Sequence, residues 1–200
     1  CRKIESGYNT DQPIRERGWT HWHHLYSPRQ LLTIGQYQEL IENVGDSPNQ
    51  CAGLLLGIGR YVDWYSKLCR WDPSAGNERG SQTYFNQALN TLANFACRSH
   101  TTLITAWYLS YPEKSFSVNT QIIPSDARRT NYVADLWITD PPYADAVNYE
   151  ELTELFLAWY EKRLQKIFPE WYADSKRALA VKGADENFRI AMVECYRRLA

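Results

Sequence analysis

The sequence predicts an α/β fold in which a mainly helical first half precedes a second half that carries a sheet. Apolar residues recur at helical spacing through most of the first hundred residues. Further along, the period changes, and two short apolar runs at 120–123 and 132–138 have the length and composition of strands. We therefore expect a helical region at 1–115, interpreted as an insertion or as a layer that recognises DNA or a partner, and a sheet-bearing catalytic region at 116–200.

One helix of the first region has clear boundaries in the sequence. Ser27 is a suitable N-cap residue, Pro28 stands at the first helical position, and Gln30 stands where a capping box requires a glutamine or glutamate. Apolar residues then recur at helical spacing as far as Val44, and the Gly-Asp-Ser-Pro segment 45–48 ends the pattern. The spacing predicts a helix over 27–44.

Four more helices follow from the same periodicity. We expect two in the first region, at 51–68 and at about 83–98, and two in the second, at about 148–167 and at 184–199. The run 132–138 is nearly continuous in apolar residues, which is typical of a central strand that is covered on both faces and flanked by parallel neighbours.

Charge and cysteine usage restrict the class of protein. The chain has 22 basic and 23 acidic residues, so no overall field attracts it to a polyanion, and any contact with nucleic acid must be local. The five cysteines are widely spaced and include no CxxC pair, which argues against a disulfide framework and a zinc ribbon. A reducing cytoplasm fits this pattern. Because no run of about 18 apolar residues occurs, we expect no membrane span.

The segment Asp140, Pro141, Pro142, Tyr143 points to a particular chemistry. It follows the predicted strand 132–138, at the position where open α/β sheets place ligands. Two consecutive prolines remove two backbone donors and hold the chain extended, with a carboxylate on one side and an aromatic ring on the other. A planar amine could be held in such a site.

This segment resembles the motif of the amino-group DNA methyltransferases. The likeness extends to a subgroup of large prokaryotic adenine-specific DNA methylases that carry a domain of unknown function, and it includes segments 18–22, 25–32, 68–73, 86–90 and 144–149. The resemblance implies a Rossmann-like sheet, S-adenosylmethionine as the methyl donor, DNA as the substrate, and partner proteins of a restriction-modification or phage-defence system.

The resemblance also implies roles for individual residues. Asp140 and the carbonyl of Pro141 would accept hydrogen bonds from the amino group of an extruded adenine, and Tyr143 would stack on the base. Asn148 and Tyr149 would line the base pocket, although Asn148 could equally cap the following helix.

The cofactor side of such a site is less complete. Asp126 would contact the adenine ring of the cofactor, or else serve as an ordinary turn aspartate. The glycine-rich cofactor loop of the family is not found: Gly57 and Gly59 lie inside a helical pattern with no strand before them, so helix packing is the better explanation. We therefore expect a fragment that lacks this loop and binds the cofactor weakly or not at all.

Two alternatives remain open at this point. Cytosine N4 could replace adenine N6 as the acceptor, because the same carboxylate and carbonyl would accept its amino hydrogens. The chain could also be a non-catalytic helical module that keeps the motif and binds DNA or a protein. We expect no metal site, because the clustered His21, His23 and His24 have no second pair of ligands nearby.

Overall fold

The computed structural model describes residues 2–73, 79–85, 89, 120–144, 147–170 and 179–200. The elements in this part of the chain are α1 (Asp11–Arg17), the 3₁₀ helix η1 (Trp22–Leu25), α2 (Pro28–Val44), α3 (Pro48–Tyr65), β1 (Arg70–Asp72), β2 (Arg79–Ser81), the 3₁₀ helix η3 (Ala127–Arg129), α5 (Tyr149–Ile167) and α6 (Glu186–Leu199). None of these helices is both long enough and apolar enough to cross a membrane.

The described residues form a mostly helical fold, and the expected α/β class is wrong. Their only sheet is the antiparallel pair β1 and β2, in which Trp71 lies opposite Gly80, and they include no Rossmann-like parallel sheet. The predicted strands 120–123 and 132–138 have no regular structure. Val133 is fully exposed and Ile138 is 89% exposed. A strand needs a neighbour to satisfy its backbone, and no described segment pairs with this one.

Several helices begin and end close to where the sequence places them. At the start of α2, the Ser27 hydroxyl accepts the N–H of Gln30, and the Gln30 side chain accepts the N–H of Ser27, so the predicted capping box is confirmed. α3 begins at Pro48 instead of residue 51, because Ser47 provides a cap by accepting the N–H of Gln50. The helix expected over 83–98 lies mostly outside the described residues, and 83–85 form a turn.

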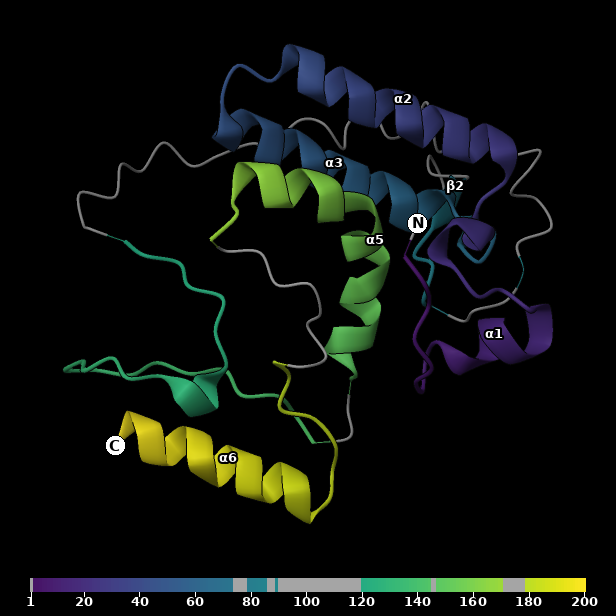
Figure 1. The fold of residues 1–200 in the computed structure, drawn as a ribbon. Coiled ribbons are helices and arrows are strands. Elements are labelled where there is room, and N and C mark those ends of the chain that lie inside the picture. Colours follow the sequence, from purple (N-terminus) through teal and green to yellow (C-terminus); the bar gives the residue numbers. More distant parts are fainter. Residues whose placement is uncertain (1, 74–78, 86–88, 90–119, 145–146, 171–178) are drawn as a thin grey trace.

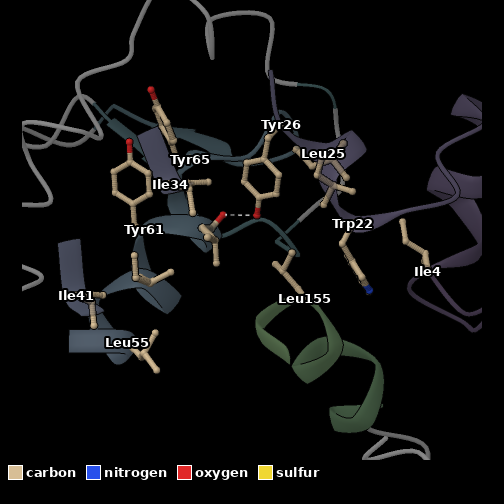
Figure 2. Packing of buried hydrophobic residues seen from close by; sticks show 13 residues of the cluster. Ile4, Trp22, Leu25, Tyr26, Ile34, Ile41, Leu55, Tyr61, Tyr65 and Leu155 are labelled. Carbon is tan, nitrogen blue, oxygen red and sulfur yellow. Dashed lines mark hydrogen bonds between the residues drawn. The ribbon is translucent and has the colours of Figure 1, made fainter. Parts of the chain in front are cut away.

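α3 is the centre of the helical layers, with α2 on one side and α5 on the other (Figure 1). Buried side chains from these helices meet those of the N-terminal segment and of η1, as Figure 2 shows. Ile34, Ile58 and Leu155 are completely buried there. Such burial of apolar side chains is the main source of stability in a domain of this size.

The core also contains aromatic side chains whose polar ends find partners. The Tyr26 hydroxyl donates to the Val62 carbonyl at 2.9 Å (Figure 2). The Tyr26 ring packs edge-to-face on Trp159 of α5, with centroids 5.2 Å apart. This contact connects η1, α3 and α5, which are distant in the sequence, within one core.

The start of α5 is fastened to the N-terminal segment. The carboxylate of Glu151 accepts the backbone N–H groups of Tyr8 and Asn9 at 3.0 and 2.7 Å. One turn further along α5, the fully buried Glu154 lies 3.8 Å from the guanidinium of Arg2. These charge-assisted contacts determine which residues surround the beginning of α5.

The segment 120–144 and α6 form a second region, apart from α2 and α3 (Figure 1). η3 packs against α6. The predicted last helix is confirmed as α6, which Asp185 caps by accepting the N–H groups of Asn187 and Phe188.

Candidate functional site

A cleft of about 730 Å³ forms where the two regions meet at the start of α5. We call it the aromatic cleft. Its lining residues come from the N-terminal segment, the turn after β2, the motif loop, α5 and the approach to α6: Tyr8, Asn9, Tyr84, Pro142, Tyr143, Val147, Asn148, Tyr149, Glu150, Leu152, Ala180, Val181, Lys182, Gly183, Ala184 and Phe188.

The structure brings four of the predicted site residues together in this cleft. Pro142 and Tyr143 of the motif lie beside Asn148 and Tyr149 of α5 in its wall. The rings of Tyr143 and Tyr149 are 65% and 53% exposed, so both have free surface on which a ligand could pack. The motif and the residues after it therefore share one concave surface.

Asp140 and Pro141 precede this surface along the chain and are not part of its wall. Asp140 is exposed and has no hydrogen bond or ion pair with any described residue. Two residues of extended chain span at most roughly 7 Å, so the backbone of Asp140 lies within that distance of Pro142. The backbone of Asp140 is thus near the margin of the cleft.

The start of α5 supplies a polar end to the cleft. Asn148 occupies the N-cap position, as expected, but its side chain makes no capping hydrogen bond. Glu150 and Glu151 are in the first turn of the helix and are buried. Because Glu151 holds the backbone of Tyr8 and Asn9, it fixes one wall of the cleft against α5.

Asp126 lies elsewhere. Its carboxylate accepts both the Nε and the Nη2 hydrogens of Arg128, at 2.9 and 2.7 Å, and also the backbone N–H of that residue. Arg128 lowers the pKa of Asp126 mainly through these side-chain hydrogen bonds. The carboxylate lines a separate cavity near α6 and is occupied by its own neighbour, as in a local turn contact.

The glycine pair inside α3 has a packing role. Gly57 and Gly59 are buried in the helix, as the helical pattern indicated. A Cβ atom at Gly59 would lie 1.8 Å from the hydroxyl of Tyr160 on α5, so only glycine allows this close approach. With Gly57 and Gly59 in a helix and Asp126 bound by Arg128, the described residues do not fit S-adenosylmethionine.

The histidine cluster is packed on itself. The rings of His23 and His24 have centroids 4.3 Å apart, and His21 is close to both. Burial, followed by the neighbouring His24 and His21, lowers the pKa of His23. No group of three metal-ligating side chains with suitable geometry occurs among the residues that the structure describes.

Several residues of the cleft could not be found from the sequence. Tyr8, Tyr84, and the pair Lys182 and Phe188 belong to three distant segments, and no periodicity connects them. Glu151 had a local signal, three residues after Asn148, but that signal indicated a helix cap. Its actual contacts, with Tyr8 and Asn9, are more than 140 residues away along the chain.

Comparisons of the chain with models of protein families, with curated proteins and with solved structures found no match. The motif and the residues around it therefore carry the functional argument by themselves.

Proposed function

We propose that this chain takes part in methylating the N6 amino group of adenine in DNA, and that it holds the extruded base in the aromatic cleft. The observation that carries this proposal is the shared location of Pro142, Tyr143, Asn148 and Tyr149. The resemblance assigns all four to the base site. They form two pairs in the chain, 142–143 and 148–149, with residues 144–147 between the pairs. Their convergence on one cleft supports a common ligand.

The cleft suits a flat heterocycle. Its volume of about 730 Å³ is in the usual range for small-molecule sites, and its wall combines aromatic rings with amide groups. Stacking of a base on an aromatic side chain contributes about 1–3 kcal/mol. Such a gain offsets much of the few kcal/mol needed to take a base out of the duplex.

Asp140 and the carbonyl of Pro141 have a defined chemical task in this proposal. The lone pair of the exocyclic nitrogen is delocalised into the ring, which makes adenine a poor nucleophile. Two acceptors that bind the amino hydrogens favour a localised lone pair, and the carboxylate stabilises the positive charge that develops on nitrogen. Asp140, exposed near the margin of the cleft, is available for an incoming base.

S-adenosylmethionine is the methyl donor that the resemblance implies. Since the described residues do not fit it, the role proposed for them is confined to the base. We propose DNA as the substrate and the cytoplasm as the location. The proposed interaction partners are proteins of a restriction or defence system.

A second candidate is a non-catalytic helical module that binds DNA or a protein. It is favoured by the mostly helical fold and by the position of Asp140 outside the wall of the aromatic cleft. This module would keep the cleft as a recognition surface without transferring a methyl group.

The substitution Asp140→Asn separates the two candidates. It keeps the size of the side chain and one acceptor oxygen but removes the charge. We expect methyl transfer by the full-length protein to fall about 10²- to 10³-fold, the usual cost of losing one preorganised electrostatic contact. Single-turnover transfer from labelled donor to DNA measures this rate, and fluorescence anisotropy should show unchanged DNA affinity.

Asp135→Asn is the matched control, because Asp135 is also exposed and lies in the same segment. It should transfer methyl groups at the unsubstituted rate. An Asp140→Asn variant as fast as this control would refute the role of the motif. A full-length protein that binds DNA but transfers no methyl group would support the second candidate.

A further inference from the structure

A second cavity, of about 610 Å³, lies where η3 meets the last turns of α6. We call it the arginine cleft. Among the residues that the structure describes, four arginines and two acidic residues line it: Asp126, Arg128, Arg129, Glu194, Arg197 and Arg198. The chain as a whole has a net charge of −1, so this excess of positive charge is local and not a reflection of composition.

The ion pair on one side of the arginine cleft accounts for one cation and one anion. Arg128 forms two side-chain hydrogen bonds with the buried carboxylate of Asp126, and neither group has a free charge to offer. The pair instead stabilises the turn of η3, because the same carboxylate also accepts the backbone N–H of Arg128.

The other three arginines are available. Arg129, Arg197 and Arg198 are exposed, and within the described part of the chain none of them has an ion pair or a hydrogen bond from its side chain. Glu194 is the remaining acidic group that faces them. Three guanidinium groups around one exposed carboxylate leave a net positive cavity.

This arrangement selects a ligand through side chains. Arg197 and Arg198 are in the last turn of α6, where the helix presents carbonyl oxygens, so the backbone gives an anion no help. Guanidinium groups have the forked geometry that matches phosphate oxygens in pairs of hydrogen bonds. Several of them in an open cavity suit an anion with many oxygens that stays partly in solvent.

We infer that the arginine cleft binds the phosphodiester backbone of nucleic acid. The choice of DNA as the source of the phosphate rests on the proposed function, while the preference for a phosphate rests on the arginines alone. The site lies beyond the aromatic cleft, and its contacts fix the position of the duplex without reading its sequence.

The test measures DNA affinity of the 200-residue chain by fluorescence anisotropy over a range of salt concentrations. In the variant Arg129→Gln/Arg197→Gln/Arg198→Gln, we expect affinity for duplex DNA to fall about 10- to 100-fold at low salt. Each phosphate contact contributes roughly 0.9 to the slope of log affinity against log salt, so the slope should decrease by roughly 2 to 3.

The control variant Arg15→Gln/Arg29→Gln/Arg189→Gln removes the same charge from exposed positions outside the cleft. It should keep nearly the affinity and slope of the unsubstituted chain. Equal losses in both variants would overturn the inference, and so would an unsubstituted chain that does not bind DNA. Binding of inorganic phosphate by an unsubstituted chain that does not bind DNA, with loss of that binding in the arginine variant, would assign the cleft to a free anion instead.

The outcome for the arginine cleft is separable from that for the aromatic cleft. If the arginine variant loses DNA while the unsubstituted full-length protein binds DNA without methylating it, the inference stands and the proposed methylation fails. If methylation depends on Asp140 but DNA affinity does not depend on the three arginines, the reverse holds.

Discussion

Apolar residues of the same kinds occur in two regions, the core of α2, α3 and α5 and the segment 120–144. In the core they are buried, and in the segment many of them are exposed. Ile58 of α3 is completely buried, whereas Val133 is completely exposed. A helix satisfies its own backbone and needs a neighbour only for its apolar face. A strand needs a neighbour for its backbone as well. The difference shows that an apolar run forms a strand only where another strand is available to pair with its backbone.

The first prediction tests this difference in burial by shortening a leucine in each region. Leu155→Ala removes a completely buried side chain from α5, and Leu136→Ala removes one that is 74% exposed. We expect Leu155→Ala to lower the free energy of unfolding by about 2–5 kcal/mol, because it combines lost burial with a cavity. Leu136→Ala should change it by less than about 0.5 kcal/mol. Denaturant titrations followed by circular dichroism measure both.

The outcome for Leu136 carries the sharper information. A loss comparable with that of Leu155 would show that the segment 120–144 is covered in solution, and the contrast between the two regions would then be invalid.

The second prediction concerns the ion pair at the start of η3, the element that packs against α6. The pKa of Asp126 is lowered below its ordinary value of 3.8, mainly by hydrogen bonds from Arg128. Its contribution to stability is therefore fully present above that value and is lost as the pH falls below it. Asp126→Asn removes the charge and weakens these hydrogen bonds, so at neutral pH η3 should be less stable by about 1 kcal/mol, and its packing against α6 should weaken with it.

Hydrogen exchange of the α6 amides between about pH 2.5 and pH 6 measures this effect. In the unsubstituted chain, protection of α6 should fall at the acidic end, whereas in Asp126→Asn it should be low and nearly independent of pH. Asp135→Asn, at an exposed site, serves as the control. Equal pH profiles for Asp126→Asn and the unsubstituted chain would show that this ion pair does not support the packing of η3 against α6.

The same contrast explains what could be predicted from the sequence. The start of α2 was predictable because a capping box involves only Ser27 and Gln30, three residues apart. The failure at 132–138 has a physical cause. A strand-like pattern reports what a segment could bury, and it does not report whether a partner strand exists.

The candidate site was predictable only in its local part. Tyr143, Asn148 and Tyr149 are close in sequence, and the motif located them together. The opposite wall depends on Glu151 reaching Tyr8 and Asn9 across the whole chain, which no local spacing encodes. For Asp126 the sequence left two roles open, a cofactor contact and a turn aspartate; its carboxylate binds Arg128, two residues along the chain, and it is not in the lining of the aromatic cleft.

The third prediction tests how closely the core is packed, by adding one methyl group at two helical glycines. Gly35 of α2 is exposed, and a Cβ there would meet nothing within 4 Å. Gly35→Ala should therefore stabilise the protein by about 0.5–1 kcal/mol, because alanine loses less conformational freedom on entering a helix. This variant provides the reference for the same change at a packed position.

Gly59→Ala makes that change at the interface between α3 and α5. The new methyl group would overlap the hydroxyl of Tyr160 and would also lie 3.5 Å from the Phe156 ring, so either the Tyr160 side chain or α5 itself must shift. Overpacking of this kind costs about 1–3 kcal/mol, from which the helical gain of up to about 1 kcal/mol is subtracted. We expect a net loss of up to about 2 kcal/mol in denaturant titrations. If Gly59→Ala stabilised the protein as much as Gly35→Ala, α3 and α5 could not approach each other as closely as Gly59 and Tyr160 indicate.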